Sequence, residues 1–141
     1  MQRVCRTSQE VIRPVIFLSV EEVIQIHDEL VSEYGGLHGI RDMGLLVSAI
    51  EMPKATMFGE YLHESIFDKA SAYLYHIVCN HAFLDGNKRT GAAATLTFLY
   101  LNGISKKYNI QKFEELVREV ARGKSSKEAI SQFLSKSNSS Y

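Results

Sequence analysis

Apolar residues recur at helical spacing in several segments of the chain, and this pattern predicts a bundle of helices. In the first segment they lie three and four residues apart, as on the buried face of a helix: Val23, Ile26, Leu30, Val31 and Tyr34. Ser19 and Glu22 have the spacing of a capping box, so we expect this helix to begin at Ser19. Gly35-Gly36 is expected to end it, and we place His27 at its polar edge.

Two apolar segments of helical period flank a polar stretch in the middle of the chain. The apolar positions of the first segment run from 66 to 78, and the pattern breaks at Asn80. The second, 92–101, is apolar almost throughout, and the Asn102-Gly103 pair after it is typical of a helix C-terminus. A helix without a wide polar face belongs in the interior, so we expect an all-α fold, a helical bundle around a central buried helix.

Shorter elements are expected around this pair of helices. Asp42 is placed to cap a short helix that Pro53 ends. Two amphipathic segments follow Tyr108, and Ser125 with Glu128 has the capping-box spacing for the start of the last helix.

Three segments lack a helical pattern. Residues 15–18 form a candidate short strand, and 35–41 is a glycine-rich loop for which a short β-hairpin or flap is allowed. Residues 56–63 are expected to be irregular, with Phe58 and Tyr61 packed over the core.

The length of 141 residues suits a single domain. We assign 1–16 to an N-terminal extension, 17–134 to the domain and 135–141 to a flexible tail. Cys5 and Cys79 do not suggest a disulfide framework, and Cys79 is interpreted as a packed core residue.

The composition is that of a soluble globular protein, with 45% hydrophobic and 23% charged residues. The 16 basic and 16 acidic residues give a formal net charge of zero, whereas a duplex-binding protein normally carries a basic excess. No direct nucleic-acid partner is therefore expected. Because the sequence has neither an apolar stretch of about 20 residues nor a recognisable signal peptide, we expect a cytoplasmic location without a membrane partner.

The polar stretch 81–91, His-Ala-Phe-Leu-Asp-Gly-Asn-Lys-Arg-Thr-Gly, concentrates reactive side chains between the two core helices. It predicts a tight loop that ends in the first turn of the second helix, where unpaired backbone N–H groups attract anions. Gly86 lets the backbone turn, and Asn87 can brace the turn with its amide. Lys88 and Arg89 add positive charge suited to phosphate oxygens.

Other side chains of the stretch complete a candidate phosphoryl- or nucleotidyl-transfer site. His81 is the natural acceptor for the proton of an attacking hydroxyl. Asp85 is the candidate ligand for a magnesium ion bound together with polyphosphate. Thr90 can either bond phosphate or cap its own helix, while Phe83 is interpreted as a core anchor. The alternative is a solvated turn whose polar residues only cap helices. His38, His63 and His76 are weaker candidates, and we interpret the last two as structural.

Residues 81–89 resemble the signature loop of the Fic/Doc superfamily in its death-on-curing (Doc) form. The segment from Gly39 to Pro53 is similar to the one that precedes the signature in Doc-type toxins. The resemblance implies the superfamily's helical fold, with ATP or another nucleoside triphosphate and Mg²⁺ as cofactors. It also implies an antitoxin protein in trans and a flap formed by 35–41, against which an extended target segment can pair.

Departures from the adenylylating Fic pattern favour the Doc branch. Those enzymes carry Pro where this chain has Ala82, Gly where it has Lys88, and a second Arg where it has Ala92. The resemblance thus implies kinase-like transfer of the γ-phosphate of ATP to a Ser or Thr hydroxyl of a protein, which inhibits translation. Elongation factor Tu is the family's known target.

The resemblance also assigns roles to the residues of the loop. It gives catalysis to His81, Asp85, Asn87, Lys88 and Arg89, and the metal to Asp85. It gives nucleotide binding to Gly86, Asn87, Lys88, Arg89 and Thr90. A Fic-type adenylyl or other nucleotidyl transferase and a non-catalytic interaction module remain as alternatives.

Many Fic proteins carry an inhibitory helix of the form Ser/Thr-x-x-x-Glu-Gly/Asn. Residues 56–60 have this spacing, but Tyr61 follows them, and we interpret the match as chance. Restraint is then expected from the separate antitoxin, through a helix laid in a groove of the bundle.

Overall fold

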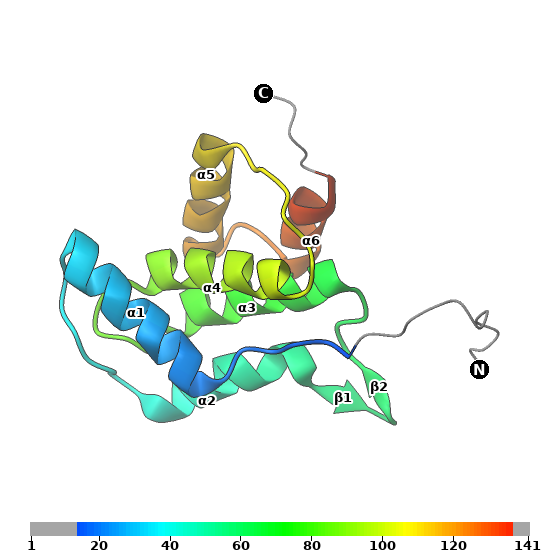
Figure 1. Cartoon of the computed structure of the whole chain (residues 1–141), viewed down its shortest axis with the longest axis horizontal. Coiled ribbons are helices and arrows are strands. Elements are labelled where there is room, and N and C mark those ends of the chain that lie inside the picture. The colour runs from blue at the N-terminus through cyan, green and yellow to red at the C-terminus, as the bar shows by residue number, and fades with distance from the viewer. Residues whose placement is uncertain (1–13, 137–141) are drawn as a thin grey trace.

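Helices arranged around a central pair make up the fold (Figure 1), as the sequence predicts. The computed structural model describes residues 14–136, so most of the expected extension and tail lies outside the described residues. The elements are α1 (Val20–Tyr34), α2 (Met43–Glu51), the 3₁₀ turn η1 (Met52–Lys54), β1 (Thr56–Met57), β2 (Glu60–Tyr61), α3 (Ile66–Asn80), α4 (Asn87–Leu101), α5 (Ile110–Ala121) and α6 (Lys127–Lys136). None of the described helices is long and apolar enough to cross a membrane.

The pair α3 and α4 forms the centre, with α1 and α2 on one side and α5 and α6 on the other (Figure 1). A small residue brings the two helices together: a Cβ added at Gly91 of α4 would meet Cγ2 of Val78 on α3 at 2.8 Å. Phe98 and Leu99 fill the core beside them. This close crossing fixes the turn that joins α3 to α4.

The predicted helix starts are confirmed at α1 and α2. Ser19 and Glu22 form the expected capping box, and the Asp42 side chain accepts a hydrogen bond from the Leu45 N–H at 3.0 Å. The last helix begins differently from the prediction. The Ser126 hydroxyl, and not that of Ser125, accepts the capping bond from Ala129, because the helix starts at Lys127.

The strand predicted at 15–18 is wrong, because this segment pairs with side chains instead of a neighbouring strand. The Asn102 amide accepts from the Ile16 N–H and donates to the Ile16 carbonyl, both at 2.9 Å. The Leu18 N–H donates to the hydroxyl of Tyr73 at 2.8 Å. An extended segment is therefore held against the central helices without a sheet.

Strands form instead at 56–61, where an irregular segment was expected. β1 and β2 pair antiparallel, with Thr56 opposite Tyr61, so no inhibitory helix forms at this position. Phe58 at the tip is 97% exposed with φ 53°, which corrects its predicted place over the core. Tyr61 is 40% exposed, so it is only partly covered, and its ring centroid lies 6.0 Å from that of Phe17.

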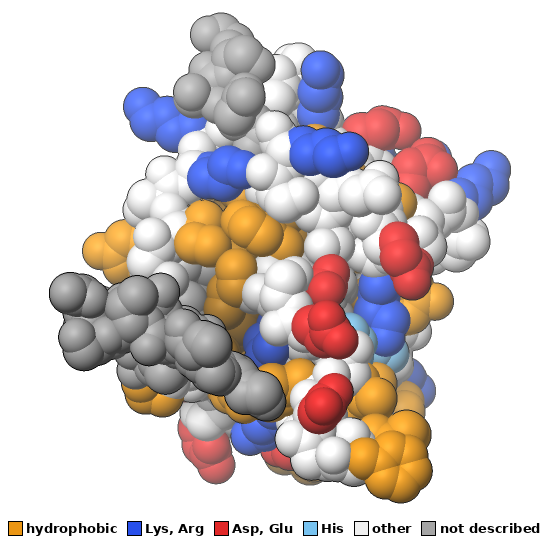
Figure 2. All heavy atoms as spheres, turned by 90° about the vertical axis from the view of Figure 1, so that its right-hand side faces the viewer, with side chains coloured by type: hydrophobic (Ala, Val, Ile, Leu, Met, Phe, Trp, Pro, Cys, Tyr) orange, Lys and Arg blue, Asp and Glu red, His pale blue; other side chains and the backbone are white. Residues whose placement is uncertain are grey.

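The end of the molecule that carries the hairpin has mixed chemistry. Figure 2 shows apolar, basic and acidic side chains interspersed on this face, without a field of one sign. Cys79 elsewhere on α3 is exposed, so its predicted place in the core is wrong. Its Sγ lies 3.7 Å from the carbonyl of Val120.

A polar network ties α6 to the start of α3. The Lys127 ammonium lies 3.1 Å from Nε2 of both His63 and His76, and the buried Lys69 donates to the carbonyls of His63 and Glu64. Burial lowers the pKa of His76 to about 4, and the Lys127 charge adds to this effect. The same two causes, burial first, lower the pKa of His63. Two neutral imidazoles that accept from one ammonium form a structural contact.

Candidate anion-binding site at the start of α4

The turn between α3 and α4 reverses the chain through two left-handed residues. His81 ends α3 at φ 51°, ψ 47°, and Gly86 precedes α4 at φ 78°, ψ 19°. Glycine suits the second position because this conformation carries no steric cost without a Cβ. Phe83 lies between them at 1% exposure and anchors the turn in the core, as predicted.

Asn87 braces the turn from inside. Its Oδ1 accepts from the Phe83 N–H and its Nδ2 donates to the Phe83 carbonyl, both at 3.0 Å. The side chain is 8% exposed, and both ends of its amide are engaged. The bracing expected from the sequence is confirmed, and only the backbone N–H of Asn87 remains available to a ligand.

The first turn of α4 has unpaired backbone donors. Its first helical bond runs from the Thr90 N–H to the Gly86 carbonyl at 2.9 Å, and the Gly86 N–H donates to Oδ1 of Asp85 at 2.9 Å. Within residues 14–136, no hydrogen bond uses the N–H groups of Asn87, Lys88 or Arg89. Three unpaired N–H groups at a helix start have the chemistry to bind an anion.

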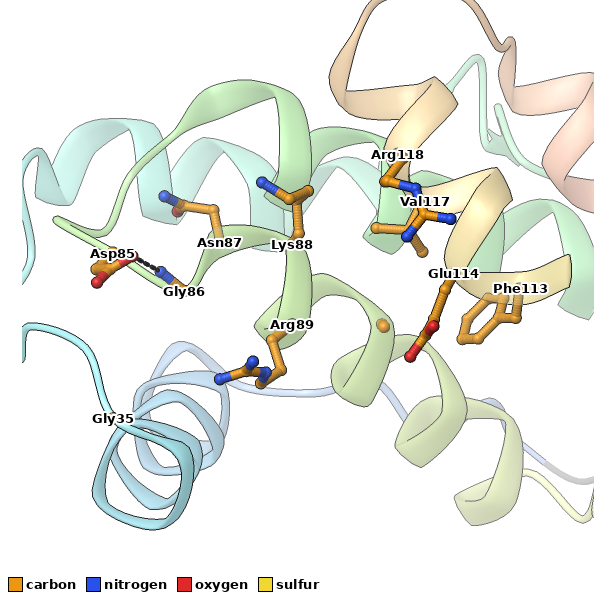
Figure 3. Close-up of a pocket in the computed structure, with 11 residues that line it drawn as sticks. Gly35, Asp85, Gly86, Asn87, Lys88, Arg89, Phe113, Glu114, Val117 and Arg118 are labelled. Carbon is orange, nitrogen blue, oxygen red and sulfur yellow. Dashed lines mark hydrogen bonds between the residues drawn. The ribbon is translucent and has the colours of Figure 1, made fainter. Parts of the chain in front are cut away.

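This helix start opens into a cavity of about 440 Å³. Its walls are Gly35, Asp85, Gly86, Asn87, Lys88, Arg89, Ala92, Phe113, Glu114, Val117 and Arg118. Lys88 and Arg89 are exposed, and the Arg89 guanidinium lies 4.9 Å from the ring centroid of Tyr34. Figure 3 shows Glu114 and Arg118 of α5 across the cavity from Lys88. Cavities that hold a whole small ligand measure ~300–1,000 Å³, so this one has room for more than a phosphate group.

Two of the predicted site residues stand apart from the cavity. His81 is exposed at the end of α3, is not among the residues that line the cavity, and its carbonyl accepts from Nε of Arg41 at 2.8 Å. Thr90 is fully buried and does not line the cavity either. Its hydroxyl has no hydrogen-bond partner among the described residues. The Thr90 side chain therefore does not cap its helix.

Asp85 has the chemistry of a magnesium ligand but already accepts two backbone bonds. Its Oδ1 binds the Gly86 N–H, and its Oδ2 accepts from the Leu37 N–H at 3.2 Å. The carboxylate is exposed beside the cationic helix start, and it keeps further lone pairs. In the part of the chain that the structure describes, no three His, Cys, Asp or Glu side chains gather to hold a metal. A magnesium ion at Asp85 would thus take its other ligands from phosphate and water.

The glycine-rich loop 35–41 lies against the motif turn. Ile40 forms an antiparallel bridge with Phe83, and the Arg41 N–H donates to the Ala82 carbonyl at 2.7 Å. The Arg41 side chain binds the carbonyls of His81 and Asn80 at the end of α3. His38 is exposed, with Nδ1 3.5 Å from Oδ1 of Asp28. The loop 35–41 is therefore packed against the motif turn through backbone hydrogen bonds.

His27, next to the motif turn, is another residue that the sequence prediction misplaced. It is 1% exposed and not at a polar edge, and its ring stacks on Phe83 with centroids 3.9 Å apart at an angle of 6°. Its Nε2 lies 2.7 Å from the Asp85 carbonyl. Spacing could have found it, because His27 is four residues from both Val23 and Val31, the buried positions of α1.

Comparison with known proteins yields one family and two close relatives. The sequence model of the Fic/DOC family matches residues 17–99. A protein named Toxin Doc from Mycolicibacterium smegmatis is 42% identical over 90 residues, which are 62% of this chain and 69% of that protein. Protein kinase doc of Escherichia phage P1 is 37% identical over 87 residues, 62% of this chain and 68% of that protein. The cavity wall on α5 lies beyond the residues that match the family.

Proposed function

Because the chain belongs to the Fic/DOC family, we propose that it is a Doc-like toxin that transfers the γ-phosphate of ATP to a Ser or Thr hydroxyl of a protein. The observation that carries this proposal is the set of unpaired N–H groups at Asn87, Lys88 and Arg89, which opens into a cavity. Phosphate oxygens are suitable ligands for such a helix start. The names of the relatives, a toxin and a protein kinase, support the same function.

In the proposed reaction the chain's own residues position phosphate and accept a proton. The backbone donors of 87–89 and the cations of Lys88 and Arg89 hold the terminal phosphate in the cavity. The target hydroxyl attacks this phosphorus while the bond to the bridging oxygen breaks, and ADP leaves. The hydroxyl proton passes to the imidazole of His81, which is exposed at the other end of the turn. Asp85 would hold a magnesium ion, which would supply positive charge to the phosphate oxygens.

His81 must meet the target hydroxyl, which arrives from solvent, so its place outside the cavity wall is compatible with this role. The loop 35–41, already bridged to Phe83, supplies a backbone edge for an extended target segment. We propose elongation factor Tu as the target because it is the family's known target.

Nucleotidyl transfer is the second candidate function. Lys88 lines the cavity where adenylylating Fic enzymes have glycine, and Ala92 stands in place of their second arginine. A lysine side chain at this position leaves less space for an α-phosphate. It therefore favours a nucleotide bound in the opposite orientation, with its γ-phosphate placed for transfer.

A comparison of two labels on ATP tests the proposal. The chain is incubated with cytosolic extract and ATP labelled on either the α or the γ phosphate. We expect a labelled protein band with γ label alone. A band with α label would replace the kinase by a nucleotidyl transferase, and the absence of any band with active extract would favour a non-catalytic module.

The relatives' names also support restraint by an antitoxin in trans. An apolar groove of about 280 Å³ between α4 and α5, lined by residues that include Leu96, Tyr100 and Ile110, has the chemistry to hold its helix. Expression of the chain alone should slow growth, and co-expression with a small protein encoded beside it should relieve this. Growth that is indifferent to both would contradict the toxin assignment.

A further inference from the structure

We propose that His27 is a positioning residue that keeps the N–H of Arg89 open for phosphate by occupying the carbonyl of Asp85. This inference rests on the proposed phosphate site and adds a residue from α1 to it. The imidazole lies beneath the turn at 1% exposure, so it contacts neither nucleotide nor target. Its effect on the ligand passes through the backbone of the motif.

The hydrogen bond fixes the tautomer of His27. Nε2 lies 2.7 Å from the carbonyl oxygen of Asp85. A carbonyl only accepts, so Nε2 must carry a proton and donate. Nδ1 faces the other way, 3.5 Å from Oδ1 of Asp28 on the same helix. The imidazole is therefore a donor aimed at one backbone atom of the motif.

The carbonyl oxygen of Asp85 is the acceptor that would extend α4 by one hydrogen bond. In an α-helix the N–H of a residue bonds the carbonyl four positions earlier, and Asp85 is four positions before Arg89. In this chain the first such bond instead runs from Thr90 to the Gly86 carbonyl. The left-handed conformation of Gly86 and the bond between His27 and the Asp85 carbonyl together keep α4 from extending backwards, and the Arg89 N–H stays unpaired.

Two packing contacts hold the imidazole in place for this task. One face stacks on Phe83, with ring centroids 3.9 Å apart. Gly86 covers another part of the ring, because a Cβ added there would lie 3.6 Å from Cδ2 and Nε2 of His27. Phe83 in turn is bonded to Asn87 through both of its backbone groups. Helix α1 thereby supports the turn from below through one side chain.

Two substitutions separate the hydrogen bond from the packing. His27→Phe keeps a flat ring against Phe83 but removes the donor, whereas His27→Gln keeps an N–H donor at similar reach. The nucleotide-free proteins are compared by amide hydrogen exchange, and the affinity for ATP with magnesium is measured by calorimetry.

We expect the Arg89 amide to exchange rapidly in the wild type and in His27→Gln. In His27→Phe it should become at least about tenfold more protected, because α4 gains the bond to the Asp85 carbonyl. The affinity for ATP should fall about tenfold in His27→Phe and by less than about threefold in His27→Gln. A merely structural role predicts the reverse for exchange, namely a looser turn and faster exchange at Arg89.

Three results would overturn the inference. These are equal Arg89 exchange in all three proteins, unchanged ATP affinity in His27→Phe, and an imidazole ¹⁵N spectrum of the wild type that places the proton on Nδ1 alone. The spectrum needs no variant, so it decides even if His27→Phe fails to fold. A wild type that binds neither ATP nor inorganic tripolyphosphate would contradict the proposed function, while the exchange and tautomer results would still test His27.

Discussion

Two lysines near opposite ends of α3 are used in opposite ways. Lys69, at the start of α3, is 2% exposed and donates to the carbonyls of His63 and Glu64 at 2.7 and 2.8 Å. Lys88, beyond the other end of α3, is exposed and lines the cavity, without a hydrogen bond or ion pair to another described residue. A paired charge holds the fold together, whereas an unpaired charge beside free N–H groups is available to a ligand.

The histidines of the two ends repeat this contrast. His63 and His76 both accept from Lys127, and burial keeps their pKa values low. His81 is exposed, and its imidazole makes no hydrogen bond within 14–136. We call the two regions the network end (His63, Lys69, His76 and Lys127) and the motif end (81–89). The contrast predicts that substitutions at the network end change stability and those at the motif end change activity.

The largest expected effect is that of His81 on phosphate transfer. His81→Asn should lower transfer about 10²–10⁴-fold, because general-base catalysis contributes this much. Asn tolerates the left-handed backbone at this position (φ 51°), so the fold should be retained. The matched control is His76→Asn at the network end, which should leave the transfer rate per folded molecule unchanged. Transfer is measured with γ-labelled ATP, and full activity of His81→Asn would exclude its role as the base.

The second effect is a loss of stability in acid that arises at the network end. His76 has a pKa of about 4 in the fold against an ordinary 6.5, so between these values the unfolded chain binds more protons. Stability is therefore complete above pH 6.5 and falls as the pH drops towards 4, and because His76 is only partly buried, solvent screening limits this loss to about 1–2 kcal/mol.

Chemical denaturation at a series of pH values measures this loss. His76→Gln should flatten the curve, because Gln can still accept from Lys127 but does not titrate. A curve of unchanged steepness in this variant would show that other groups cause the acid sensitivity.

The two lysines of the comparison give the third prediction. Lys69→Met should lower the unfolding free energy by about 1–3 kcal/mol, because two carbonyls lose their donor. Lys88→Gln should leave stability unchanged and weaken ATP binding about tenfold, because a charge-assisted phosphate contact is lost. Thermal unfolding and calorimetry on both variants check this. Similar effects of the two substitutions in both assays would contradict the expectation that the network end determines stability and the motif end determines ligand binding.

The smallest effect is expected at the hairpin. Phe58 is 97% exposed with φ 53°, and Gly59 follows it at φ 80°. An Asn-Gly pair suits a tight hairpin turn with two such residues better than Phe-Gly. Phe58→Asn should therefore raise the unfolding free energy by about 0.5–1 kcal/mol without changing transfer. Reduced transfer would show instead that the exposed ring serves the function.

Local signals in the sequence predicted the backbone of the motif turn, although His81 and Thr90 of the predicted site do not line the cavity. The glycine at 86, the bracing amide of Asn87 and the cations at 88 and 89 all lie within one turn of chain, where spacing determines proximity. The capping box at Ser19 is local in the same sense.

The sequence failed where a contact joins distant segments. The extended segment at Ile16 pairs with Asn102, and the far wall of the cavity comes from α5. No local pattern marks either contact. His27 is different, since its spacing from Val23 and Val31 points to the interior, whereas its position next to Ile26 was interpreted as the polar edge of the helix.

The central claim is that phosphate binds at the unpaired first turn of α4, and amide NMR tests it most directly. ATP with magnesium is titrated into ¹⁵N-labelled protein, and the shifts of the backbone amides are followed. We predict that the largest shifts occur at the amides of Asn87, Lys88 and Arg89, while those of Lys69 and Lys127 stay unchanged. Saturable shifts elsewhere, with these three amides unmoved, would contradict the claim.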